Sequence, residues 1–375
     1  MKILFVIGTR PELIKVAPII LAFKNSGYQD KIKVLFTAQH KDILNQYSKI
    51  FGIKADYELD FMNKGQSLGM LTSRAFSQTD VFFNNLKEKD ELPEYVVVQG
   101  DTTTVFSVGV SAFYYGIKVA HVEAGLRTYD LDNPFPEEFN RRAVSIFADI
   151  NFAPTKLSAK NLYKEGIKKS NVKIVGNTVI DALQYIIKSK TFNESIFVEP
   201  KLNKIILQKD KVVLITFHRR ENQNNNLLEL ISAVTSLSKT YKDTTFIWTV
   251  HPNPKIKDIV LNSEISKRKN IILVPPLEYI DILKIMSLSK IILSDSGGIQ
   301  EEAPSFGVPV IVLRKSTERP EGVIAKKVFL TNVVFGEIID KFTDLYNNYS
   351  SINLDNPYGD GKSSTRIMGF LLSQN

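Results

Sequence analysis

Short apolar runs alternate with longer amphipathic stretches through the first half of the chain. The runs have the length of strands, which we predict at residues 2–7, 33–37, 95–99, 118–121 and 150–152. Between them, the spacing of apolar positions predicts helices at residues 11–25, 69–89 and 104–115. Strands that alternate with helices in this way are typical of a parallel sheet covered by helices.

The same alternation begins again after about residue 175. Here we predict strands at residues 212–216, 245–249, 271–274, 291–293 and 310–313, and helices at 225–240, 279–287 and 299–306. The pattern predicts an α/β protein of two doubly wound, Rossmann-like domains, residues 1–175 and 176–356. Ligands of such sheets bind outside the carboxyl ends of the strands, so we expect an active-site cleft between the domains.

The length and the composition limit the number of domains and the kinds of site that the chain can contain. A length of 375 residues agrees with two domains, because single domains usually hold about 100 to 200 residues. The chain has no Cys, which excludes disulfides, a thiol nucleophile and a zinc–thiolate site, and agrees with a reducing compartment. The first apolar run is too short for a signal peptide, and no run reaches the roughly 18 apolar residues of a membrane helix. We therefore predict a cytoplasmic protein without a membrane segment.

The net charge of +8 makes nucleic acid the first partner to consider. However, the Lys residues are spread along the chain with Asp and Glu among them, and no basic tail or long basic block occurs. A modest positive excess suits small anionic ligands equally well. We expect no nucleic-acid partner.

The turn after the first predicted strand has the residues of an anion site. Gly8 permits a tight turn, and Pro11 suits the first position of a helix. A helix N-terminus beside Arg10 and Lys15 attracts anions such as phosphate. Neither the Gly-rich dinucleotide fingerprint nor a P-loop occurs in the chain, so NAD and ATP lack their usual anchors and we expect no cofactor.

A second strand-to-helix turn, at residues 293–302, contains two consecutive glycines. The backbone N–H groups of Ser296, Gly297 and Gly298 can face phosphate oxygens there. Glu302 follows in the helix, where its carboxylate can accept hydrogen bonds from ribose hydroxyls. The alternative is an ordinary Gly-rich turn with a capping serine.

Three acids follow or neighbour predicted strand ends of the first domain. Asp101 follows the strand at 95–99, Glu123 follows the next strand, and Glu137 lies in a loop stiffened by two prolines. Acids that share one sheet edge can have their pKa values separated by burial and mutual repulsion. One acid can then act as a base while another donates a proton. Singly, each acid is more often a helix cap or a salt-bridge partner.

All four His residues of the chain closely follow predicted strands. His218 and His251 belong to the second domain, so they could face the acids across the cleft. A metal site is the competing interpretation, but the histidines lack the spacing of a metal-binding motif, and we expect no metal.

Seven motifs in register closely resemble those of the non-hydrolysing UDP-N-acetylglucosamine 2-epimerases. They are Gly8-Thr9-Arg10-Pro11-Glu12, Gly100-Asp101-Thr102-Thr103-Thr104, His121-Val122-Glu123-Ala124-Gly125-Leu126-Arg127-Thr128, Pro136-Glu137-Glu138, His218-Arg219-Arg220-Glu221, Asp295-Ser296-Gly297-Gly298-Ile299-Gln300-Glu301-Glu302-Ala303-Pro304-Ser305 and Thr317-Glu318-Arg319-Pro320-Glu321. The resemblance runs from Lys2 to the tail at residues 356–361, which is nearly the whole chain.

The resemblance implies a fold, a site and an assembly. The implied fold is glycosyltransferase-B-like, with a final segment, about residues 357–375, that packs back on the first domain. The implied catalytic residues are Asp101, Glu123, Glu137 and His218. The implied substrate contacts are Arg10, Lys15, Arg141, His251, Leu277, Ser296, Gly297, Gly298, Glu302 and Arg319. Members of the family usually form homodimers and supply N-acetylmannosamine units for cell-surface polysaccharides.

The sequence departs from the family pattern at two places. Gln99 stands where the family often has His before the Gly-Asp-Thr-Thr-Thr run. Gln39 and His40 belong to a segment that helps form a substrate-activation pocket in some bacterial members, but the neighbouring stretches 41–42 and 64–66 differ from that pattern.

The activity implied by the resemblance is that of an isomerase, which interconverts UDP-N-acetylglucosamine and UDP-N-acetylmannosamine by elimination and re-addition of UDP. Four other interpretations stay open. These are a 2-epimerase of another UDP-2-acetamido sugar, a hydrolysing epimerase that releases N-acetylmannosamine and UDP, a retaining glycosyltransferase on the same fold, and a catalytically inactive sugar-nucleotide-binding module.

Overall fold

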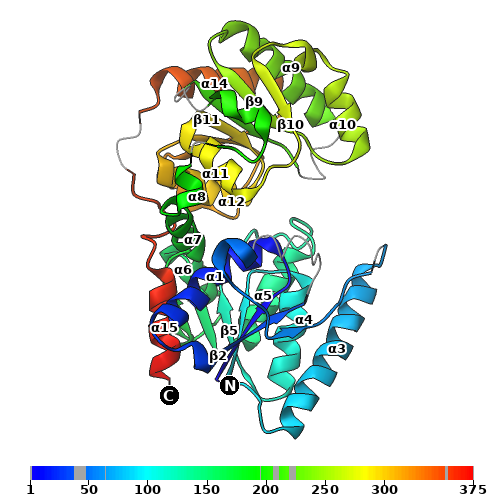
Figure 1. Ribbon diagram of the computed structural model, residues 1–375, viewed down its shortest axis with the longest axis vertical. Coiled ribbons are helices and arrows are strands. Elements are labelled where there is room, and N and C mark those ends of the chain that lie inside the picture. Colours follow the sequence, from blue (N-terminus) through cyan, green and yellow to red (C-terminus); the bar gives the residue numbers. More distant parts are fainter. Residues whose placement is uncertain are drawn as a thin grey trace. The chain divides into compact units, whose positions relative to one another are not determined.

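The structure is a computed structural model that describes residues 2–37, 48–63, 65–194, 196–205, 211–218, 225–350 and 354–374. The chain divides into two compact units, each built around one parallel sheet (Figure 1). Unit 1 comprises Met1–Gln184 and Tyr358–Asn375, and unit 2 comprises Tyr185–Pro357.

The sheet of unit 1 has the strand order β3-β2-β1-β4-β5-β6-β7, and all of its pairs are parallel. Its strands are β1 (Ile3–Ile7), β2 (Ile32–Phe36), β3 (Tyr57–Glu58), β4 (Tyr95–Gln99), β5 (Lys118–Val122), β6 (Ile150–Ala153) and β7 (Val172–Ile174). The order reverses between β1 and β4. Ligands of doubly wound sheets bind at the carboxyl ends of the strands that flank such a reversal.

Helices cover the faces of this sheet. They are α1 (Arg10–Asn25), α3 (Leu68–Glu88), α4 (Thr103–Tyr114), α5 (Glu137–Phe147), α6 (Lys156–Lys164), α7 (Thr178–Ile187) and α15 (Ser363–Ser373), with short 3-10 turns η1 (Gln29–Lys31) and η2 (Lys169–Asn171). All of β1 is buried, and its side chains alternate between the faces. Leu4 and Val6 join the core formed with α3 and α4, whereas Phe5 packs edge-on against Phe23 of α1.

The end of the chain returns to unit 1. Helix α15, red in Figure 1, lies beside α1. The backbone N–H groups of Ser363 and Ser364 donate to the Asp181 carboxylate at 3.2 and 2.8 Å, and the Ser364 hydroxyl donates to it at 2.6 Å. Arg366 donates to the Val175 carbonyl at 3.0 Å. A buried carboxylate therefore anchors the N-terminus of α15.

The sheet of unit 2 has the strand order β10-β9-β8-β11-β12-β13, again parallel throughout. Its strands are β8 (Val212–Thr216), β9 (Thr245–Thr249), β10 (Ile271–Val274), β11 (Ser289–Ser294), β12 (Val310–Leu313) and β13 (Val328–Thr331). Its helices are α8 (Lys190–Asn193), α9 (Asn225–Thr240), α10 (Pro254–Leu261), α11 (Tyr279–Leu288), α12 (Gly297–Glu302), α13 (Pro320–Ile324) and α14 (Phe335–Asn348), with 3-10 turns η3 (Pro200–Ile205), η5 (Glu264–Lys267) and η6 (Ala303–Phe306). The strand order reverses between β8 and β11.

Trp248 of β9 and Phe342 of α14 are fully buried in the core that α9 and α14 form with this sheet. The predicted α/β class with two doubly wound sheets is confirmed. The helix predicted at 299–306 is wrong in one respect, because α12 ends at Glu302 and a 3-10 turn continues it. Pro304 lacks the N–H that an α-helix needs there. No helix among the described residues is long and apolar enough to cross a membrane.

Candidate active site

The turn between β1 and α1 begins the polar edge of unit 1. Thr9 is the N-cap of α1, and its side-chain oxygen accepts the N–H of Glu12 at 3.4 Å. A Cβ atom at Gly8 would lie 2.8 Å from the Thr37 hydroxyl oxygen, so only glycine fits there without a shift. Arg10 is the first residue of the helix and is exposed. The predicted anion site thus has a helix N-terminus with an exposed cation.

Glu123 follows β5 and forms a buried ion pair with a residue of α1. Lys15 Nζ lies 2.5 Å from Glu123 Oε2, and Gln99 Nε2 donates to the same oxygen at 2.7 Å. Both donors favour the charged form of the carboxylate. Glu123 has a φ of +66°, a left-handed conformation that is costly for a residue with a Cβ atom. Lys15, predicted as a substrate contact, therefore holds a predicted catalytic acid in place.

Asp101 follows β4 and is bound by Arg141 of α5. Arg141 donates to Asp101 Oδ2 from Nη2 at 2.5 Å and from Nε at 3.0 Å. Arg141 also binds Glu138, whose Oε2 accepts from Arg141 Nη1 at 3.1 Å. Glu138 is fully buried and also accepts the backbone N–H groups of Thr128 and Tyr129, each at 3.0 Å. Sequence reasoning missed Glu138, although it stands beside Glu137 in the quoted motif.

The predicted acids come from neighbouring parts of unit 1. Because β4 and β5 pair in parallel with Gln99 opposite Val122, Asp101 and Glu123 leave the sheet at the same edge. Glu137 is the first residue of α5, partly exposed, one turn before Arg141. The geometry supplies carboxylates with different environments, as acid–base chemistry requires.

His121 lies in β5 and is fully buried. Its Nε2 lies 2.7 Å from the Gly100 carbonyl oxygen, so Nε2 carries the hydrogen of this contact. Burial lowers the pKa of His121 to about 4, and the imidazole is therefore neutral near pH 7. Its hydrogen bond supports the turn that places Asp101.

In unit 2, Asp295 positions His218. The backbone N–H of His218 lies 3.0 Å from both carboxylate oxygens of Asp295, which follows β11 and is fully buried. The rings of His218 and His251 have centroids 5.9 Å apart. His251 Nδ1 accepts the N–H of Asn253 at 3.0 Å, so a neutral His251 carries its hydrogen on Nε2. Asp295 belongs to the quoted motif, but its role as a support is visible only in the structure.

The Gly-rich turn after β11 differs in one detail from the prediction. The N–H of Ser296 donates to the Ser294 hydroxyl at 3.0 Å and is used inside the turn. Gly297 and Gly298 begin α12, where first-turn N–H groups have no partner within the helix. A Cβ atom at Gly297 would lie 2.7 Å from Arg319 Nη1, so the guanidinium packs directly on the turn. Arg319 Nε in turn donates to Glu301 at 2.6 Å.

Glu302 is buried in α12 and accepts a hydrogen bond from the Tyr279 hydroxyl. Tyr279 is the first residue of α11 and is separated from Leu277 by the N-cap Glu278. Leu277 is partly exposed. The predicted ribose contact Glu302 is thus bound by a residue two positions after the predicted contact Leu277, and Tyr279 is a further polar group that sequence reasoning missed.

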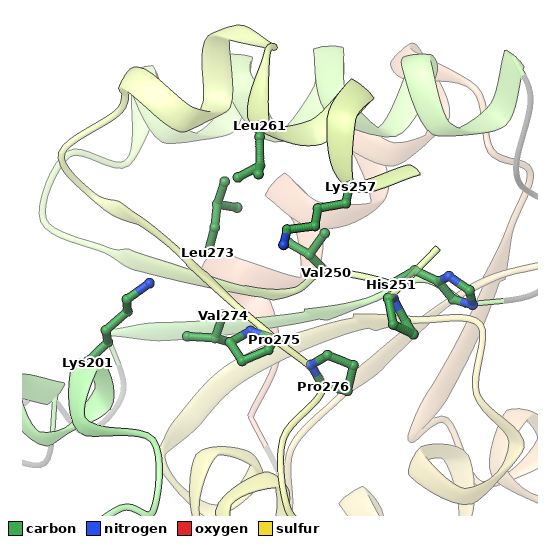
Figure 2. A pocket seen from close by; sticks show the side chains of 10 residues that line it. Lys201, Val250, His251, Lys257, Leu261, Leu273, Val274, Pro275 and Pro276 are labelled. Carbon is green, nitrogen blue, oxygen red and sulfur yellow. The ribbon is translucent and has the colours of Figure 1, made fainter. Parts of the chain in front are cut away.

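Unit 2 also contains a cavity of about 450 Å³ beside His251 (Figure 2). The residues that line it come from the ends of β9 and β10, from α10 and from η3: Lys201, Val250, His251, Pro252, Lys257, Leu261, Leu273, Val274, Pro275 and Pro276. Figure 2 shows the ammonium groups of Lys201 and Lys257 turned toward one another across the space. An apolar lining with two cations and no carboxylate suits an anionic ligand with a flat apolar part.

Some predicted residues lie outside the described part of the chain. These are Gln39 and His40 of the effector segment, and residues 219–221 of the motif that begins with His218. Within the described ranges, no group of three His, Cys, Asp or Glu side chains could hold a metal ion.

The family model described as UDP-N-acetylglucosamine 2-epimerase matches residues 25–372. The chain is 43% identical over 377 residues to the UDP-N-acetylglucosamine 2-epimerase of Neisseria meningitidis serogroup A, covering 99% of each sequence. A crystal structure of the Neisseria meningitidis UDP-GlcNAc 2-epimerase bound to UDP-GlcNAc superposes with a TM-score of 0.89, 42% identity and full coverage of both chains.

Two further structures bear on the fold. The S. aureus MnaA–UDP structure has a TM-score of 0.87 and 37% identity, covering 100% of this chain and 96% of the other. MurG of Acinetobacter baumannii, at 12% identity, a TM-score of 0.59 and full coverage of both chains, is similar in fold alone. These likenesses confirm the predicted class of two Rossmann-like domains of the glycosyltransferase-B-like type.

Proposed function

The chain belongs to the UDP-N-acetylglucosamine 2-epimerase family, and from this premise we propose that it interconverts UDP-N-acetylglucosamine and UDP-N-acetylmannosamine without hydrolysis. It is accordingly an isomerase. The observation that supports the chemistry is the pair of carboxylates at one sheet edge, Asp101 and Glu123, each held by a cation of the same unit. General acid–base catalysis needs carboxyl groups fixed in this manner.

The reaction is an elimination followed by an addition. The hydrogen on carbon 2 is weakly acidic, because the acetamido group does not place a carbonyl next to that carbon. A base removes this proton while the bond between carbon 1 and UDP breaks, which gives a glucal-like alkene and UDP. UDP then adds back to carbon 1, and a proton is delivered to carbon 2 on the opposite face. No oxidant or reductant is needed.

In this proposal the proton transfers belong to unit 1. Asp101, Glu123 and Glu137 are the acids, and two proton-handling groups are required, one for each face of the sugar. Lys15 holds Glu123, and Arg141 holds Asp101. A substitution of either cation would therefore change turnover through the orientation of the acid that it holds. The roles of these residues are part of the proposal.

The diphosphate and the nucleoside require hydrogen-bonding groups of their own. His218, oriented by Asp295, and the N–H groups of Gly297 and Gly298 would stabilise the leaving UDP together with Arg10. Glu302, supported by Tyr279, would accept from the ribose. The remaining proposed substrate contacts are Ser296, Arg319, His251 and Leu277.

The test is incubation of the purified protein with UDP-N-acetylglucosamine in heavy water, followed by NMR of the sugar protons. We expect UDP-N-acetylmannosamine with deuterium at carbon 2, and later deuterium in recovered substrate, without added cofactor. Accumulation of free N-acetylmannosamine would identify a hydrolysing epimerase instead. Turnover of only a different UDP-2-acetamido sugar would move the assignment to that substrate.

Three further properties follow from family membership and belong to the same proposal. We infer a homodimer, a cytoplasmic location and a role in supplying N-acetylmannosamine units for polysaccharides. Light scattering after size exclusion measures the first, with a mass of twice 42.4 kDa expected. Activation by substrate through Gln39 and His40 is proposed as well, and a sigmoidal dependence of rate on substrate concentration would support it.

A further inference from the structure

Glu12, which has no role in the mechanism above, lies at the reversal of strand order in unit 1. Its side chain is 2% exposed. Oε2 accepts the N–H of Gly8 at 2.6 Å, while Oε1 accepts the hydroxyls of Thr9 at 3.0 Å and Thr102 at 2.9 Å. One carboxylate therefore joins the turn after β1 to the turn after β4.

The two hydroxyls belong to the N-caps of two helices. Thr9 caps α1, and Thr102 caps α4 by accepting the N–H of Val105 at 3.2 Å. Each threonine oxygen accepts a backbone N–H of its own helix, which leaves the hydroxyl hydrogen to donate to Glu12. The three donors match the lone pairs of an ionised carboxylate, and the positive ends of both helix dipoles favour its negative charge.

The proposed site residues stand directly beside these caps. Arg10 follows Thr9, and Asp101 precedes Thr102. A change in the distance between the two caps would therefore change the position of the Arg10 backbone relative to Asp101. Catalytic groups displaced by about 1 Å can lose about 100-fold in rate.

We propose that Glu12 is a positioning residue, which fixes the N-termini of α1 and α4 to one another and thereby sets the geometry between the diphosphate contact at Arg10 and the acid Asp101. This assignment rests on the proposed function of that site. Glu12 is buried behind the turns and acts through Thr9 and Thr102.

A buried negative charge behind an anion site has a second consequence. The carboxylate of Glu12 partly offsets the positive potential of the two helix N-termini, where UDP is proposed to bind. Glu12→Gln removes that charge and replaces one acceptor oxygen by an NH₂ group, so either the two hydroxyls or the N–H of Gly8 loses its acceptor. We expect slower turnover without weaker UDP binding, a combination that general loss of structure does not produce.

The experiment measures kcat and the Kd for UDP in the full-length protein at pH 8, above the pKa of about 7 that burial gives Glu12, so that the carboxylate is ionised. Glu12→Gln and Thr102→Val should each lower kcat about tenfold or more, with the UDP Kd equal to or lower than that of the wild type for Glu12→Gln. Thr102→Ser, which retains the hydroxyl, should restore most of the turnover. The matched control is Thr155→Val, which removes the N-cap hydroxyl of α6 at a site that does not contact Glu12. It should lower the melting temperature and leave kcat within about twofold.

A double-mutant cycle separates this inference from the proposed function. If Glu12 and Thr102 act together, the melting temperature of the double variant will exceed the value expected from adding both single losses. Additive losses would overturn the link between the two caps, whatever the activity. Equal losses of kcat in Thr102→Val and Thr155→Val, or wild-type kcat in Glu12→Gln, would overturn the positioning role. If the wild-type protein is inactive on UDP-N-acetylglucosamine, the proposed function is wrong. The double-mutant cycle then still measures whether Glu12 links the two helix caps.

Discussion

In unit 1 two carboxylates that follow strands, Asp101 and Glu123, are paired with cations of the same unit, whereas in unit 2 a carboxylate that follows a strand orients an imidazole. Lys15 pairs with Glu123, and Arg141 binds Asp101. In unit 2, the buried Asp295 accepts the backbone N–H of His218. The same doubly wound architecture thus produces two different kinds of polar edge.

The difference separates two tasks. Carboxylates fixed by cations suit proton transfer, because their orientation and charge are set before the substrate arrives. A helix N-terminus with imidazoles suits a diphosphate. Substitutions in unit 1 should therefore act mainly on kcat, and substitutions in unit 2 mainly on the affinity for UDP.

The largest effect is expected for the acids of unit 1. Asp101→Asn, Glu123→Gln and Glu137→Gln should each lower turnover by about 100-fold or more, because an amide does not exchange the proton. UDP affinity should change much less. The control is Glu88→Gln, at an exposed position near the end of α3. Near-normal kcat in all three variants would contradict the assignment of these acids.

A substitution in the turn of unit 2 tests the other half of the comparison. Gly297→Ala places a methyl group 2.7 Å from Arg319 Nη1 and displaces the guanidinium from the turn. We expect the UDP Kd to rise about tenfold, the scale of a lost charged hydrogen bond, with a smaller change in kcat. Gly336→Ala is the matched control, because a Cβ atom there meets no heavy atom within 4 Å. A fall in kcat with unchanged Kd would break the proposed division of tasks.

The sequence predicted the parts of the fold that local patterns determine. Buried central strands give continuous apolar runs, and the residues that follow them were identified from their position alone. Strands β3, β7 and β13 were not predicted, and all three lie at sheet edges and have two to four residues. β3 and β7 have two and three residues and each includes a charged one, so their apolar runs are too short to be distinguished from a loop, whereas the edge strand β10 was predicted because all four of its residues are apolar.

The sequence proposes the members of the candidate site, but it does not show which of their side chains meet. Lys15 and Glu123 are 108 positions apart, and no local pattern shows that their side chains meet. Glu138 was missed for the same reason, since its burial depends on the loop at Thr128 and on Arg141. Ion pairs of this kind depend on how distant segments pack, and a single sequence contains no signal of that packing.

A smaller effect is expected at the ribose contact of unit 2. Tyr279→Phe removes the hydroxyl that donates to Glu302 and leaves the ring in place. Glu302 can then turn away from the nucleoside, and we expect UDP affinity to fall about threefold, in the range of one ordinary hydrogen bond. Calorimetric titration with UDP and with UMP measures this loss, which should be similar for both ligands because the ribose is common to them. A loss confined to UDP would place the contact at the diphosphate instead.

The last comparison concerns Glu12, which differs from Asp101 and Glu123 because its described hydrogen-bond partners are a backbone N–H and two hydroxyls. Burial raises the pKa of Glu12 from 4.5 to about 7, although the hydrogen bonds from Gly8, Thr102 and Thr9 lower it. Charged groups on the adjoining elements are Arg10 and Lys15 on α1 and Asp101 before α4.

Between these two pKa values the folded protein holds a proton that the unfolded chain has released. The stability that Glu12 contributes is therefore complete below about pH 4.5 and is lost as the pH rises through 7. Glu12→Gln has no such dependence, so the melting temperature of the wild type relative to this variant should fall by about 4 °C between pH 5 and pH 8. Scanning calorimetry of both proteins across this range measures the difference, in which all other titrating groups cancel. If the difference in melting temperature between the two proteins does not change with pH, Glu12 is as easily ionised as an exposed acid. Its surroundings would then not distinguish it from the acids that are paired with cations.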